Sequence, residues 1–67
     1  MYNAEFNRGN IMKQYAIYFE DMAIEYTGYF KSVNAVRKYL RERYNDNGKG
    51  LTFRAVYPEV ENKFYKV

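Results

Sequence analysis

The chain has 67 residues, with 11 Lys and Arg against 8 Asp and Glu and a formal net charge of +3. This length predicts a single domain spanning residues 1–67, with too small a core for a wide stability margin. Because the chain has no Cys and no His, it lacks disulfides and the usual zinc ligands, so we predict no metal and no cofactor.

Residues 1–12 are rich in Asn and show no clear period, which predicts an extended lead-in. Residues 14–20 and 23–30 then alternate between two faces, as half-buried strands do. The segment between them is short, so the two strands form a β-hairpin. With a turn at Asp21 and Met22, Phe19 would face Ile24. The residues expected to face the core are Tyr15, Ile17, Phe19, Ile24, Tyr26 and Phe30, and those expected on the opposite face include Tyr18, Glu25, Thr27 and Tyr29.

Ser32 is a typical helix N-cap, since its hydroxyl can accept a hydrogen bond from a first-turn amide. The apolar residues that follow recur every three or four positions and predict an amphipathic helix to about residue 44. Asn and Gly in residues 45–50 tolerate left-handed backbone and end the helix. Residues 51–57 alternate again as a third strand, which Pro58 ends. The helix residues expected to face the core are Val33, Val36, Leu40 and Tyr44.

The element order predicts an α+β fold, with a small antiparallel β-β-α-β sheet and one helix packed on one face. Residues 60–67 are predicted to form a short edge strand or a tail. No hydrophobic stretch approaches the ~20 residues that cross a bilayer, so we predict no membrane contact. The start of the sequence has no signal-peptide pattern, and we expect a soluble, cytoplasmic protein.

Catalysis has little support in this sequence. Nucleophilic catalysis needs a base beside the nucleophile, and the single serine, Ser32, suits a helix cap. The adjacent or near-adjacent carboxylates, Glu20 with Asp21 and Glu59 with Glu61, occupy positions where exposed charges are usual. Residues 45–50 match neither a calcium loop nor a phosphate-binding loop. We therefore predict that the chain is not an enzyme and has no catalytic residues.

The charge distribution indicates binding. Residues 31–54 carry seven basic and two acidic residues, a balance of +5, whereas the rest carries four basic and six acidic residues, a balance of −2. Basic helix residues can contact phosphates or an acidic protein, and sheet tyrosines can stack on bases. The predicted partner-binding residues are Arg37, Lys38, Arg41, Lys49, Arg54, Tyr18 and Tyr29. The terminal segments or a second copy of the chain, as a homodimer, could instead cover the tyrosines.

Two functions follow from these residues. The first is a non-enzymatic binding protein that contacts a host protein with an acidic surface, in the manner of a phage or mobile-element modulator or inhibitor. The alternative is a small nucleic-acid-binding domain that uses the basic helix face and the exposed tyrosines. Charge alone does not separate them, because acidic proteins and phosphates attract the same basic surface.

Overall fold

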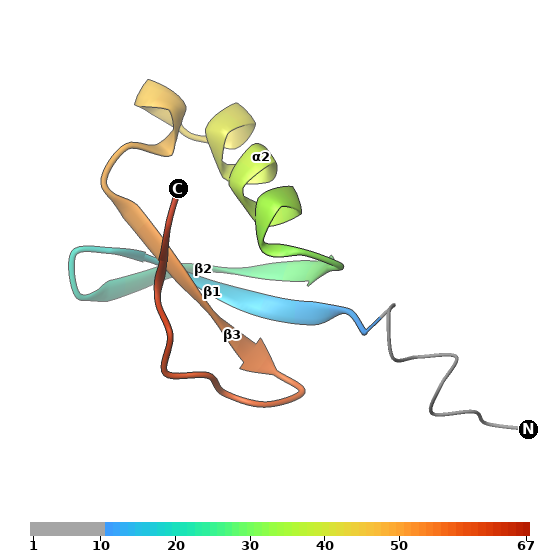
Figure 1. Cartoon of the computed structure of the whole chain (residues 1–67). Coiled ribbons are helices and arrows are strands. Elements are labelled where there is room, and N and C mark those ends of the chain that lie inside the picture. The colour runs from blue at the N-terminus through green and yellow to red at the C-terminus, as the bar shows by residue number, and fades with distance from the viewer. Residues whose placement is uncertain (1–10) are drawn as a thin grey trace, which may run out of the picture.

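The computed structural model describes residues 11–67 and contains a four-stranded antiparallel sheet. Helix α2 lies on one face of this sheet (Figure 1). The strand order is β2-β1-β3-β4. This arrangement confirms the predicted fold class, including the short fourth strand. The elements are β1 (Lys13–Phe19), β2 (Met22–Phe30), α2 (Val33–Arg43), the short 3-10 segment η1 (Asn45–Gly48), β3 (Leu51–Tyr57) and β4 (Tyr65–Lys66). Most of the predicted lead-in, residues 1–10, lies outside the described residues.

The helix α2 begins and ends as its sequence predicts. The Ser32 hydroxyl accepts a hydrogen bond of 3.1 Å from the backbone N–H of Ala35, which makes Ser32 the N-cap. At the other end, the Tyr44 N–H donates to the Leu40 carbonyl at 3.0 Å. Asp46 and Asn47 then adopt left-handed backbone, with φ of 56° and 55°. The chain thereby turns from α2 toward β3.

The core lies between α2 and the facing side of the sheet. Val36 and Leu40 of α2 and Ile17 and Phe53 of the sheet are fully buried. The remaining buried members are Tyr15, Leu51 and Ala55, and the partly buried residues packed against them include Phe30, Val33 and Tyr44. The predicted inward set of the helix is therefore confirmed.

The predicted register of the hairpin is wrong. Phe19 pairs with Met22, and Ile17 pairs with Glu25 and not with Tyr26. The pairing of β1 with β2 shifts at two places, and at each place β2 contains one residue more than β1. Each extra residue is a bulge that reverses the alternation of the strand. As a result, Glu25 lies on the helix side, whereas Tyr26 is moved to the opposite face and is 62% exposed.

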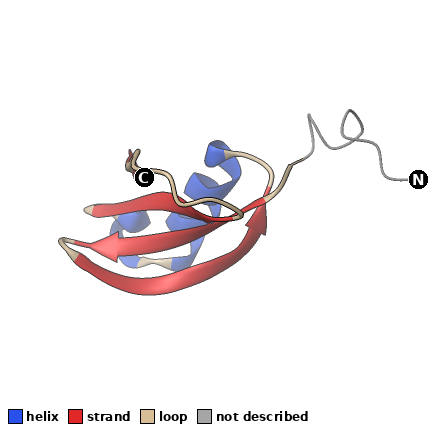
Figure 2. Ribbon diagram, turned by 90° about the horizontal axis from the view of Figure 1, so that it is seen from below, coloured by secondary structure: helices blue, strands red, loops and turns tan. Residues whose placement is uncertain are grey.

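The two edges of the sheet are poor templates for a further strand. The bulges interrupt the regular pairing of β2 at one edge. At the other edge β4 has two residues, and the Glu61 N–H donates to the Ala55 carbonyl of β3 at 2.9 Å. Figure 2, seen from below, has the strands in front of α2. Within residues 11–67, the face of the sheet turned away from α2 is therefore not covered by a helix.

Candidate interaction surfaces

The face of the sheet opposite α2, here called the open face, carries a group of aromatic rings. Strand pairing places Tyr29 and Tyr57 on either side of Gln14, and it places Tyr26 and Arg54 on either side of the buried Ala16. The rings of Tyr29 and Tyr57 meet edge to face at 5.9 Å. The open face includes Gln14, Ala16, Tyr18, Ala23, Tyr26, Tyr29, Thr52, Arg54, Tyr57, Phe64 and Lys66. None of these residues carries a negative charge.

Exposure of the rings on the open face is high for aromatic side chains. Tyr26, Tyr29 and Tyr57 are 62%, 50% and 53% exposed, and Phe64 is 50% exposed. Large rings on one uncovered face are unusual unless they serve contact with another molecule. The C-terminal segment covers the face in part, because Phe64 packs edge to face on Tyr18 with ring centroids 5.3 Å apart.

Arg54 is the positive charge that lies against rings of this face, and Lys66 lies at the β4 edge of the same face, opposite Thr52. The Arg54 guanidinium carbon lies 5.6 Å from the Tyr18 ring centroid and 5.2 Å from that of Phe64. Its Nε donates to the Tyr18 hydroxyl oxygen at 3.1 Å. The ion pairs within residues 11–67 are Lys13 with Glu61 and Arg43 with Glu25, so Arg54 has no carboxylate partner there.

The second surface is a basic band on the outer side of α2, formed by Arg37, Lys38 and Arg41. Lys38 and Arg41 are exposed. Arg37 is half-buried at the margin, where its Nε donates to the Lys66 carbonyl at 2.9 Å and its Nη1 to the Asn34 side chain at 2.9 Å. None of the three pairs with a carboxylate within the described part of the chain. The band therefore keeps its positive charge.

The structure divides the predicted partner-binding residues between these two surfaces. Tyr18, Tyr29 and Arg54 lie on the open face, as predicted, whereas the basic band lies on the other side of the sheet, and Lys49 is exposed beyond η1. One flat partner cannot contact both. The sequence reading missed Tyr26, Tyr57 and Phe64. A bulge of β2 moves Tyr26 to the open face, the register shift between β1 and β3 moves Tyr57 there, and Phe64 of the C-terminal segment packs on Tyr18.

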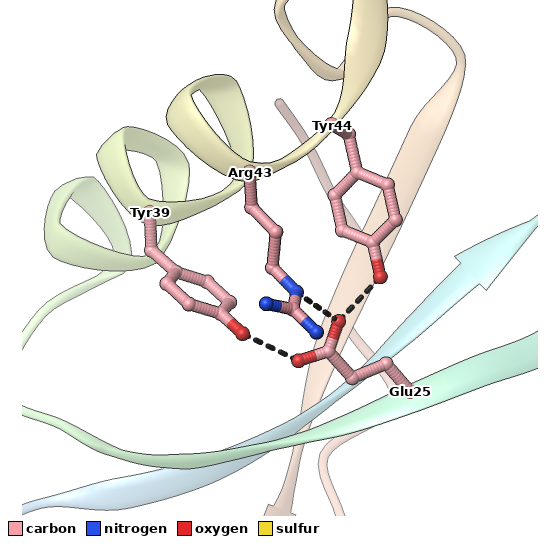
Figure 3. A network of polar contacts seen from close by, with 4 residues as sticks. All are labelled: Glu25, Tyr39, Arg43 and Tyr44. Carbon is pink, nitrogen blue, oxygen red and sulfur yellow. Dashed lines mark hydrogen bonds and ion pairs between the residues drawn. The ribbon is translucent and has the colours of Figure 1, made fainter.

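A network around Glu25 fastens α2 to β2 (Figure 3). The Glu25 carboxylate accepts hydrogen bonds from the hydroxyls of Tyr39 and Tyr44 and from the Arg43 Nε at 3.1 Å. Partial burial alone would raise the pKa of Glu25, but these three hydrogen bonds outweigh it and lower the pKa. Burial and the hydrogen bond to Glu25 raise the pKa of both tyrosines. The hydrogen-bonding capacity of the Glu25 carboxylate is therefore taken up within the chain.

A hollow of about 320 Å³ lies between the hairpin tip and η1. Its apolar lining comes from Phe19, Ile24, Tyr44 and Leu51, and Lys49 also lines it.

Within residues 11–67, no three His, Cys, Asp or Glu side chains gather closely enough to hold a metal ion. In the same range, no helix has the length and apolar character to cross a membrane.

Comparisons with models of protein families, with curated proteins and with solved structures find no match to this chain.

Proposed function

We propose that this chain is a non-enzymatic protein-binding domain and that its main interface is the open face. The single observation that supports this most is the set of four large rings on this face, each at least half exposed, of which Phe64 lies against Arg54. Tyr, Phe and Arg are enriched at protein interfaces, where Tyr and Arg in particular contribute much of the binding energy. A role in modulating or inhibiting host machinery stays a prediction from the sequence.

The separation of charge and rings favours a protein over a nucleic acid as the partner of the open face. A single-stranded nucleic acid brings one phosphate per nucleotide, so its binding surfaces combine stacking rings with several cations. Two rings of the open face lie against Arg54, and the other cation on this face within residues 11–67 is Lys66 at the β4 edge. The basic band of Arg37, Lys38 and Arg41 lies on the far side of the sheet. A protein surface with few charges fits such a face better.

The test is a capture experiment with variants matched across the two surfaces. A photo-reactive amino acid at position 57 is expected to crosslink one protein in a lysate of the source cells. The double variant Tyr26→Ser and Tyr29→Ser should lose that protein, whereas Lys38→Glu with Arg41→Glu should retain it. Retention by the tyrosine variant, or crosslinks to nucleic acid alone, would refute the proposal.

The basic band supports a second candidate function, nucleic-acid binding through α2. Its three cations have no carboxylate partner within residues 11–67 and could contact phosphates. Binding to a 20-nucleotide strand at about 50 mM salt should then weaken with a log–log salt slope of roughly −2 to −3. Arg37→Ala, Lys38→Ala and Arg41→Ala should each reduce the affinity and the slope. Absence of binding to both DNA and RNA at this salt excludes the candidate.

A further inference from the structure

We propose that Arg54 is the anchor by which the open face binds a carboxylate side chain, Asp or Glu, of its protein partner. This inference rests on the proposed function and names the residue and the chemical group that it recognises. It predicts that the partner carries an acidic residue surrounded by apolar or aromatic side chains.

The geometry around Arg54 orients its guanidinium. Its Nε is taken by the Tyr18 hydroxyl at 3.1 Å, and the rings of Tyr18 and Phe64 lie against it. The two terminal amino groups have no hydrogen-bond partner within residues 11–67. A guanidinium held in this way presents a planar pair of donors, which matches the two oxygens of a carboxylate.

Charge complementarity identifies the occupant. Within residues 11–67 the open face carries two cations, Arg54 and Lys66, and no anion. Arg54 is the cation that lies against rings of this face, so it is the site to which a single negatively charged group is attracted. Rings that surround an ion pair exclude water and strengthen the attraction between the charges. A phosphate backbone would place further negative charges over uncharged tyrosines, which provide no counter-charge. A protein carboxylate is therefore the better match.

The same chain already contains this recognition in complete form. On the helix side, Arg43 lies 5.7 Å and 5.9 Å from the ring centroids of Tyr39 and Tyr44, and it pairs with the Glu25 carboxylate. Arg54 with Tyr18 and Phe64 repeats the arginine and the two rings but lacks the carboxylate. We infer that the partner supplies it.

The experiment selects binders from a displayed library of random 12-residue peptides on the wild-type chain. Selected peptides are expected to share an Asp or Glu beside an aromatic or aliphatic residue. The affinity of a selected peptide is then measured with wild-type protein, Arg54→Met, Arg54→Lys and the control Lys31→Met at an exposed residue outside both surfaces, each checked for folding by circular dichroism. Loss of a charged hydrogen-bonded pair should weaken binding roughly tenfold or more for Arg54→Met. Arg54→Lys, which keeps the charge but not the planar fork, should show a smaller loss.

A double-substitution cycle assigns the contact. Replacing the acidic residue of the peptide by its amide should cost wild-type protein the same factor as Arg54→Met, and should cost the Arg54→Met variant little more. Affinity within twofold of wild type for Arg54→Met, or an equal amide effect in both proteins, would overturn the anchor. Binding of an oligonucleotide that depends on Arg54 would overturn the choice of partner.

The proposed function and the anchor fail in distinguishable ways. If Tyr26→Ser with Tyr29→Ser abolishes peptide binding while Arg54→Met does not, the open face is the interface but Arg54 is not its anchor. If the tyrosine variant binds as well as wild type, or if the library yields no peptide for wild-type protein, the proposed interface itself is wrong.

Discussion

Two clusters on opposite sides of the sheet pair an arginine with two aromatic rings, and they differ in one group. Arg43 lies against Tyr39 and Tyr44 and contacts the Glu25 carboxylate at 3.1 Å. Arg54 lies against Tyr18 and Phe64, and no carboxylate within residues 11–67 contacts it. The first cluster joins α2 to β2, whereas the second faces solvent.

The difference indicates separate roles for similar side chains. Three donors of the chain bond to the Glu25 carboxylate, so these contacts contribute to folding and leave this carboxylate little capacity to bond to a partner. Around Arg54, the rings and the guanidinium contribute less to folding, because half of the Phe64 surface is exposed. We therefore expect changes in the first cluster to affect stability and changes in the second to affect binding.

The largest effect on stability is expected from Glu25→Ala. It leaves the hydroxyls of Tyr39 and Tyr44 and the Arg43 guanidinium without their acceptor, which should lower the free energy of unfolding by about 2 kcal/mol. Urea denaturation followed by circular dichroism measures this. The control is Glu42→Ala on the exposed side of α2, expected to change stability by less than about 0.5 kcal/mol. Equal effects of the two substitutions would contradict a structural role for the network.

The dependence of stability on acidic pH should show the contribution of Glu25 in the first cluster. Because the folded-state pKa of Glu25 is lowered, the folded state binds fewer protons than the unfolded state as the pH falls. The contribution of Glu25 is therefore complete above its unfolded pKa of about 4.3 and is lost as the pH falls through its folded pKa. Thermal melts from pH 7 to pH 3 should show this loss, and Glu25→Gln should flatten it.

The same linkage acts with the opposite sign in alkali. The pKa values of Tyr39 and Tyr44 are raised in the folded state, so their contribution is complete below the unfolded pKa of about 10. It is lost as the pH rises through the folded values. Melts from pH 8 to pH 11 of wild-type protein and of a Tyr39→Phe, Tyr44→Phe variant check this, and identical pH profiles would contradict it.

The sequence predicted the elements well but placed the residues of β2 poorly. Period and capping identified both hairpin strands, the helix after Ser32 and the third strand, because each depends on local spacing. The faces of β2 depend on its pairing with β1, and two bulges reverse its alternation. Glu25 was therefore assigned to solvent and Tyr26 to the core. Gly28 was a usable signal, since glycine within a strand often marks a bulge.

The candidate site could be predicted only in part for a related reason. Tyr18, Tyr29 and Arg54 could be placed on the open face from the sequence, because each of them lies on the face that simple alternation along its strand predicts. The predicted partner-binding residues fall on two surfaces, because the sheet lies between Arg54 and the basic band, and spacing along the chain does not show this separation. Phe64 was missed because its contact with Tyr18 joins segments far apart in the sequence.

A smaller effect on stability is expected from the two arginines, compared directly. Arg43→Met removes a donor to Glu25 and should lower the urea midpoint measurably. Arg54→Met keeps the apolar stem against Tyr18 and Phe64 and should change the free energy of unfolding by no more than about 0.5 kcal/mol. Parallel urea titrations of both variants make the comparison. A larger loss for Arg54→Met would mean that the open-face cluster stabilises the fold and is not kept for a partner.

The sharpest division of roles is expected from removing single hydroxyls. Tyr44→Phe takes a donor from Glu25 and should lower the free energy of unfolding by about 1 kcal/mol. Tyr18→Phe takes the acceptor from the Arg54 Nε and should change it by less than about 0.5 kcal/mol. Its effect should instead appear in the affinity for an acidic peptide, because the ring remains while the guanidinium loses the contact that orients it. Urea titration and peptide binding on both variants test this. If Tyr18→Phe destabilised the fold as much as Tyr44→Phe and left peptide affinity unchanged, the two clusters would share one structural role.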